Sequence, residues 1–358
     1  MESVIVYPYS KLFTPILRQL AYDRKFNIVS VIMPGKWYKD GIDASFVDEG
    51  SIIGIEVRNN FEEELNKCST VIWSSYEYSD KALFQKIVQQ IKVAMIKGKN
   101  IICQQMLDLE MQQQLIGFSE ECGVRFEYQY SEYVNQKYFD HIGRNNVPII
   151  TITGIGEDCS KFENQLMVRR LLENNGYDVL LIGSRQGCSF LDIYDFPSFM
   201  FSTVYSETDK IMYFRNYVCQ LEKEENPDVI IIGVPGGIMP LNDRHNMGFG
   251  IICYEVFNAI QSDFNIFNLW CEEYSNEFIK EMENIMKYRF NTPIDCICFS
   301  NMRVDNESLD DDKIQYEVLD AEFVNSRLLS LTNLSSYNPL NSQSSLALKE
   351  KILSQLIK

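Results

Sequence analysis

The stretch from Thr151 to Phe162 constrains the fold of this chain more than any other. It reads Thr-Ile-Thr-Gly-Ile-Gly-Glu-Asp-Cys-Ser-Lys-Phe, so an apolar run leads into two glycines and then a lysine. A strand, a glycine-containing turn and a helix in this order form a phosphate-binding loop (P-loop), in which backbone N–H groups and the lysine face the anion. The loop is degenerate, because Ser160 replaces the glycine before Lys161 and Phe162 replaces the hydroxyl residue that holds magnesium.

Apolar strand patterns alternate with helical patterns along the rest of the chain. The run 27–33 predicts a strand, 83–95 has apolar residues at helical spacing, and 100–103 is apolar again. This alternation predicts an α/β protein with two doubly wound (Rossmann-like), mostly parallel sheets. No G-x-G-x-x-G follows the first strand, so a dinucleotide site is not indicated there.

The 358 residues suggest about two domains and a tail. The polar segment 141–147 marks the boundary, which gives a Rossmann-like domain over 1–145 and a degenerate P-loop NTPase-like domain over 146–330. Serine and asparagine dominate 331–345, so 331–358 is interpreted as a flexible linker followed by an amphipathic C-terminal helix. That helix either docks back on the body or binds a partner.

Charge and composition exclude several classes of protein. The formal net charge is −17, which opposes binding to nucleic acid or to an anionic membrane surface. No apolar run of about 18 residues is present, so no membrane span is expected. The ten cysteines lie mostly within apolar patterns and no signal peptide is recognised, so we expect reduced thiols in a cytoplasmic protein.

A second motif makes the P-loop interpretation more specific. Residues 154–162 align with the loop G-x-x-x-x-x-G-K-T, and 233–242 read Gly-Val-Pro-Gly-Gly-Ile-Met-Pro-Leu-Asn. Together they resemble the dethiobiotin synthetase/cobyric acid synthase class of P-loop NTPases, in which the second motif begins with an acidic residue. Gly233 stands at that acidic position, so both metal contacts expected from the resemblance are missing. ATP turnover by the ordinary metal-dependent route is therefore not expected.

The candidate site lies where parallel strands end. A nucleotide, ATP or ADP, is the candidate cofactor, and a P-loop kept only as scaffold is the alternative. No catalytic residue and no metal ligand can be named. The candidate nucleotide-binding residues are Gly154, Gly156, Ser160, Lys161, Arg185, Gly236, Gly237 and Asn242.

Three further features carry weaker hypotheses. His245 is a candidate for acid–base chemistry, with an ordinary exposed loop histidine as the alternative, whereas His141 has no spacing partner. Cys159, at a helix N-terminus, is a candidate reactive thiol. Cys296 and Cys298 share one face of a strand, but a metal site needs further ligands.

At full length the chain resembles a bacterial peptide maturation system protein family, through the loop at 154–161, the Ser-Arg-Gln-Gly turn at 184–187, the segment 228–242 and the polar C-terminal extension. The resemblance implies an accessory protein in the maturation of a ribosomally produced, modified peptide. It implies a cysteine-rich precursor peptide or a maturation enzyme, such as a radical enzyme, as partner.

Three functions remain open at this point, and so does assembly into a homo-oligomer. The first is the accessory binding protein. The second is an ATP-dependent ligase or amide-forming enzyme of the dethiobiotin synthetase type, based on Lys161 and the Gly236–Gly237 turn. The third is a thiol- or metal-handling chaperone that uses Cys159 or the pair Cys296 and Cys298.

Overall fold

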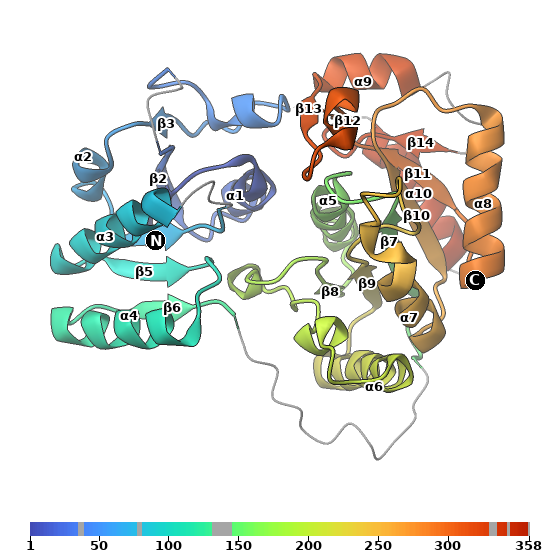
Figure 1. Cartoon of the computed structure of the whole chain (residues 1–358), viewed down its shortest axis with the longest axis horizontal. Coiled ribbons are helices and arrows are strands. Elements are labelled where there is room, and N and C mark those ends of the chain that lie inside the picture. The colour runs from blue at the N-terminus through green and yellow to red at the C-terminus, as the bar shows by residue number, and fades with distance from the viewer. Residues whose placement is uncertain (35–38, 77–80, 131–144, 329–334, 342–343, 357–358) are drawn as a thin grey trace. The chain divides into compact units, whose positions relative to one another are not determined.

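The computed structural model describes residues 1–34, 39–76, 81–130, 145–328, 335–341 and 344–356. The chain forms two compact units (Figure 1). The first contains Met1–Ser131 and Gly187–Asp192, and the second contains Glu132–Gln186 and Ile193–Lys358. Most of the predicted junction at 141–147, with His141, lies outside the described residues.

The first unit is built on a parallel sheet of six strands in the order β3-β2-β1-β4-β5-β6. This is the strand order of a doubly wound dinucleotide-type fold. Strands β1 and β4 are buried almost throughout, as expected for strands covered by helices on both faces. The strands are β1 (Ser3–Tyr7), β2 (Asn27–Ile32), β3 (Val57–Arg58), β4 (Thr70–Trp73), β5 (Asn100–Cys103) and β6 (Phe126–Tyr128). The helices are α1 (Thr14–Asp23), α2 (Phe61–Leu65), α3 (Lys81–Ile96) and α4 (Leu109–Cys122), with short 3-10 turns η1 (Lys11–Phe13) and η2 (Ala44–Val47).

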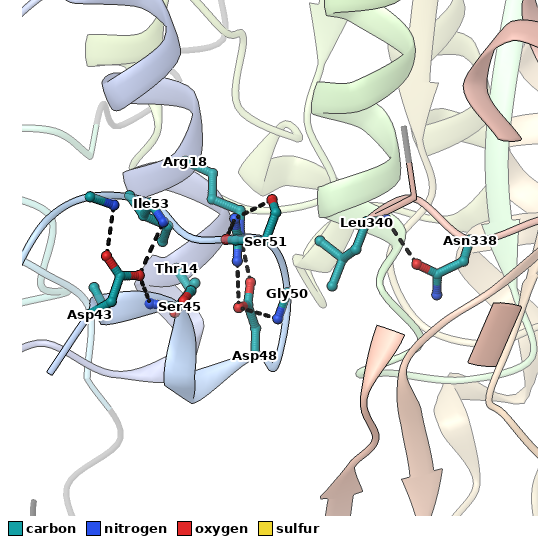
Figure 2. A network of polar contacts seen from close by, with 12 residues as sticks. Thr14, Arg18, Asp43, Ser45, Asp48, Gly50, Ser51, Ile53, Asn338 and Leu340 are labelled. Carbon is teal, nitrogen blue, oxygen red and sulfur yellow. Dashed lines mark hydrogen bonds and ion pairs between the residues drawn. The ribbon is translucent and has the colours of Figure 1, made fainter. Parts of the chain in front are cut away.

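A polar network fixes the long connection between β2 and β3 against α1 (Figure 2). Arg18 on α1 donates two hydrogen bonds to the Asp48 carboxylate, both 2.7 Å long. Asp43 accepts from the backbone N–H groups of Ser45 and Ile53. Both carboxylates therefore make structural hydrogen bonds that hold this connection in place.

The segment Gly187–Asp192 belongs to the first unit although it lies between two strands of the second in sequence. Its 3-10 turn η3 (Ser189–Leu191) is held by side chains of the first unit. Ser189 Oγ donates to Gln129 Oε1 over 2.6 Å, and Lys25 Nζ donates to the Phe190 carbonyl over 2.8 Å. No strand or helix pattern in the sequence predicts that this segment packs in the first unit.

The second unit is built on another parallel sheet of six strands, in the order β14-β11-β10-β7-β9-β8. A two-stranded antiparallel ribbon, β12-β13, accompanies it. The strands are β7 (Ile149–Gly154), β8 (Val179–Ile182), β9 (Val229–Gly233), β10 (Phe264–Leu269), β11 (Cys296–Phe299), β12 (Met302–Val304), β13 (Tyr316–Val318) and β14 (Ser336–Tyr337). The helices are α5 (Lys161–Glu173), α6 (Glu207–Glu225), α7 (Ile251–Ala259), α8 (Asn276–Phe290), α9 (Ala321–Leu328) and α10 (Ser344–Leu356), with 3-10 turns η4 (Ser198–Phe201), η5 (Met247–Gly250) and η6 (Asn306–Asp310).

The C-terminal segment is part of this second unit. Strand β14 pairs with β11, and Tyr337 is buried, although serine and asparagine had indicated a linker here. Leu348 and Ile352 on α10 are buried, and Lys351 Nζ donates to the Asp295 carbonyl. The described part of α10 therefore docks on the body, which is the first of the two alternatives.

These two sheets confirm the predicted fold class, because every pairing within each six-stranded sheet is parallel and helices connect the strands. In the described ranges, no helix has both the length and the apolar character needed to cross a bilayer.

Candidate functional site

The loop after β7 lies at the point where the second sheet reverses its strand order. From β7 the chain moves two places to β8, returns to β9, and then crosses to β10 on the other side of β7. In open α/β sheets, ligands bind beyond the carboxyl ends of the strands at such a switch point. The loop between Gly154 and Lys161 therefore occupies the position that topology favours for a ligand.

The glycines of the loop are required by close packing. A Cβ atom on Gly154 would lie 2.5 Å from the Cys159 sulfur, and one on Gly156 would lie 2.6 Å from the Trp270 ring. A Cβ atom on Gly237 would lie 2.5 Å from the Ile155 carbonyl oxygen. The two glycine motifs, far apart in sequence, thus pack against each other.

Three side chains, two of them from outside the loop, hold carbonyl oxygens of the loop. Asn268 Nδ2 donates to the Cys159 carbonyl over 3.0 Å, and Trp270 Nε1 donates to the Glu157 carbonyl over 3.0 Å. Lys161 Nζ donates to the Gly156 carbonyl over 2.5 Å. In a trans peptide the C=O and the next N–H point in opposite directions. These contacts therefore turn the N–H groups of the following residues away from the groups that hold the carbonyls.

The loop presents N–H groups that have no acceptor. Among the described residues, nothing accepts from the backbone N–H of Glu157, Asp158 or Ser160. Asp158 and Ser160 have φ angles of 48° and 58°, and successive N–H groups in such turns form concave anion sites. Ser160 begins α5 without a side-chain cap, whereas Ser206 caps α6 through its hydroxyl. The start of α5 thus keeps the donors that an anion would use.

Lys161 lies across the loop and joins it to the second glycine motif. Its side chain is only 7% exposed, and its Nζ donates to the carbonyl oxygens of Gly156 and Gly236. Both acceptors are neutral, so these contacts leave the positive charge uncompensated. An anion in the loop can replace them.

The metal side of the loop is filled by protein. Phe162 is buried, and the Arg185 guanidinium lies over its ring, 5.0 Å from the centroid. A Cβ atom on Gly233 would lie 2.1 Å from Gln165 Nε2, so the Gln165 amide takes the space that an acidic side chain would need. Gln165 is held there by Ser184, whose Oγ accepts from Nε2 over 2.8 Å. Both expected metal contacts are therefore absent, and packing occupies the space at both positions.

The structure brings together most of the candidate nucleotide-binding residues that we named from the sequence. Gly154, Gly156, Ser160, Lys161, Gly236 and Gly237 surround the loop, and Arg185 lies beside it over Phe162. Asn242 is used differently. Its Oδ1 accepts from the backbone N–H groups of Arg244 and His245, and its Nδ2 donates to the Leu309 carbonyl. This amide ties a surface turn to η6, and short-range turn chemistry explains that role.

The histidine and thiol hypotheses find little support. His245 Nε2 is buried with no hydrogen-bond partner among the described residues, so no acid–base pair forms there. Cys159 is buried and its sulfur donates to the Gly156 carbonyl, and burial raises its pKa although Lys161 opposes the shift. Burial raises the pKa of Cys296 to about 12 and that of Cys298 well above its usual value. Within the described ranges, no group of three or more His, Cys, Asp or Glu side chains could hold a metal ion.

Several residues of the site were missed by sequence reasoning. Gln165 lies one helical turn after Phe162, so the i, i+3 spacing on α5 was a usable signal for it. Asn268 and Trp270 end a strand at the same carboxyl edge as the loop. Strand β10 reads Phe-Asn-Ile-Phe-Asn-Leu, and the asparagine nearest its carboxyl end was the available sign for Asn268.

No protein-family model matches the chain, and no curated protein matches it either. Among solved structures, a DUF1611 family protein from Anabaena variabilis is similar over 99% of this chain and 100% of that one, with a TM-score of 0.61 and 12% identity. At this identity the likeness shows the fold alone. It nevertheless spans both units.

Two further solved structures match part of the chain. A plasmid partition protein from Borrelia burgdorferi covers 59% of this chain and 97% of its own, with a TM-score of 0.36 and 13% identity. A cobyrinic acid a,c-diamide synthase from Mycobacterium smegmatis, which holds ADP and magnesium, covers 57% and 92%, with a TM-score of 0.31 and 11% identity. These scores are too low to support a conclusion. The P-loop-like character of the second unit rests on its topology and loop geometry.

Proposed function

We propose that the second unit binds a phosphorylated ligand, with ADP or ATP as the candidate nucleotide, without magnesium and without hydrolysing it. The N–H groups of Glu157, Asp158 and Ser160 beside Lys161, which have no acceptor in the described part of the chain, carry this proposal. Such an array, with a lysine and a helix N-terminus, favours phosphate oxygens. Arg185 supplies a second positive charge near the start of α5.

Two observations support binding without turnover. Phosphoryl transfer depends on a metal ion that bridges and neutralises the phosphate oxygens. Phe162 and Gln165 fill the space where the metal contacts would lie. The acidic side chains of Glu157 and Asp158 are exposed, so solvent screens their repulsion of a bound anion.

Calorimetric titration with ADP tests the proposal. Wild-type protein should bind, and Lys161→Ala should weaken binding by about tenfold to a hundredfold, because a charged hydrogen bond to phosphate contributes about 1.5–3 kcal/mol. Lys223→Ala is the matched control. That lysine is exposed near the end of α6, at the opposite edge of the sheet from the loop, and its loss should leave affinity unchanged.

Absence of ADP and ATP binding by wild-type protein would leave the loop as scaffold and contradict the proposal. Release of phosphate from ATP with magnesium, lost in Lys161→Ala, would instead favour the ligase alternative. No observation at the loop favours that alternative at present, because both positions that should hold the metal lack oxygen ligands.

The biological role is a finer proposal, and it rests on the sequence resemblance alone. We propose an accessory protein that holds a precursor peptide or a maturation enzyme while a ribosomally produced peptide is modified. The first test is to look beside the gene for a short reading frame that encodes a cysteine-rich peptide, which this role predicts. Pull-down of the neighbouring gene products by purified protein is the second. Lack of any interaction at micromolar concentration would count against this role.

A further inference from the structure

A row of buried polar side chains runs from the C-terminal strand to the candidate anion loop. The Tyr337 hydroxyl donates to Asn164 Oδ1 over 2.6 Å. Asn164 Nδ2 donates to Asn268 Oδ1 over 3.0 Å, and Asn268 Nδ2 donates to the Cys159 carbonyl over 3.0 Å. Asn164 and Asn268 are fully buried, and Tyr337 is 2% exposed. We call these three residues the Tyr337 relay.

Each step of the relay is a donor-to-acceptor contact in the same direction. The hydroxyl fixes the Asn164 amide, that amide fixes the Asn268 amide, and the last NH₂ group holds a loop carbonyl. A buried amide that loses its partner bears the cost of desolvation, so every member depends on the next. The residues come from β14, α5 and β10, three elements that are distant in sequence.

The last contact determines the direction of a loop peptide. Because Asn268 holds the Cys159 carbonyl, the N–H of Ser160 points the opposite way. That N–H is one of the donors without an acceptor at the start of α5. Asn268 therefore orients a donor of the candidate site without facing the ligand itself.

We infer that Tyr337 and Asn164 are positioning residues that act through Asn268 to hold the anion loop in its binding shape. This assigns a role to the C-terminal strand. Asn338 Nδ2 donates to the Phe299 carbonyl, and Asn338 Oδ1 accepts from the Leu340 N–H (Figure 2). Those contacts anchor β14 on β11 next to Tyr337. The inference concerns the loop shape and does not require the proposed ligand.

The thiol of Cys159 can report whether the loop is open or closed. Cys159 is fully buried beneath Gly154, so it reacts with an alkylating reagent only when the loop opens. Peptide mass spectrometry of protein treated with N-ethylmaleimide gives a rate for each cysteine of the full chain. Tyr337→Phe should raise the rate at Cys159 about tenfold, while Cys219, buried on α6 of the second unit, keeps its rate. Cys296 and Cys298 are not suitable controls, because Cys298 hydrogen-bonds with Tyr337.

A matched control removes a different buried hydroxyl. Tyr217 is 2% exposed and its hydroxyl donates to the Asp195 carbonyl, a contact that does not lead to the loop. Tyr217→Phe should leave Cys159 unchanged. An unchanged Cys159 rate in Tyr337→Phe would overturn the inference. So would an equal increase at Cys219, since that would report general destabilisation.

A double variant tests whether the effect passes through Asn268. Asn268→Ala alone should also raise the Cys159 rate, and adding Tyr337→Phe to it should change the rate little further, because the path is already broken. Full additivity of the two effects would contradict a relay. If wild-type protein fails to bind ADP, the proposed function fails, and the labelling result still decides the relay.

Discussion

At the scale of single residues, the site differs from an active P-loop by replacements that pack together. Phe162 is covered by Arg185, and Gly233 leaves room for the Gln165 amide. Gln165 in turn is bonded to Ser184, so the substitutions form one packed group. A metal site at this position would need several coordinated changes.

Restoring the acidic residue alone should therefore destabilise the second unit. In Gly233→Asp, the new Cβ meets Gln165 and the carboxylate is buried without a metal, so we expect a loss of about 2–4 kcal/mol. Differential scanning calorimetry measures this as a lower melting temperature. Adding Gln165→Ala should recover part of the loss. Gly117→Asp, at an open position on α4, serves as control and should have little effect. A Gly233→Asp variant as stable as wild type would contradict the packing argument.

At the scale of elements, α6 and α7 enclose a carboxyl pair that the candidate site does not use. Glu255 is fully buried, and Lys210 lies between its carboxyl group and that of Glu207, 3.3 Å from Glu207. Burial raises the pKa of Glu255 to about 8, while the pKa of Glu207 is lowered, chiefly by its hydrogen bond with Glu255. Lys210 also lies 3.6 Å from Glu255, and its charge favours both carboxylates. Glu255 therefore keeps its proton near neutral pH.

This pair predicts a pH dependence of stability. The folded state keeps a proton on Glu255 that the unfolded chain releases near pH 4.5, so stability falls as pH rises from about 5 towards 8. Glu255→Gln should remove most of that fall and stabilise the protein at pH 8 by on the order of 2 kcal/mol. Urea unfolding at a series of pH values measures it, with exposed Glu224→Gln as control. Equal pH profiles for wild type and Glu255→Gln would contradict the raised pKa of Glu255.

The elements also show what the sequence could predict. Parallel strands buried on both faces read as apolar runs, so β7, β9 and β10 were visible with their connecting helices. Strand β14 has only two residues and leaves no periodic pattern, so serine and asparagine suggested a linker. Asn242 ends the second motif, but its side-chain oxygen accepts from the backbone of its own loop, a direction that spacing does not encode.

At the scale of the whole molecule, two doubly wound units occur in one chain, and a DUF1611 family protein has a similar fold over the same extent. The sequence predicted both sheets, because each has its own alternation of strands and helices. The segment Gly187–Asp192 belongs to the first unit, where it contacts Gln129 and Lys25, and no local sequence pattern reveals these contacts.

The magnesium dependence of ADP affinity tests the central claim most directly. Titrations of the full chain with ADP, in excess magnesium and in excess EDTA, should show that magnesium does not lower the dissociation constant, since Phe162 and Gln165 leave no metal contact in the site. Neither condition should yield phosphate from ATP. A dissociation constant at least tenfold lower with magnesium, or steady phosphate release that depends on Lys161, would contradict a metal-free binding site.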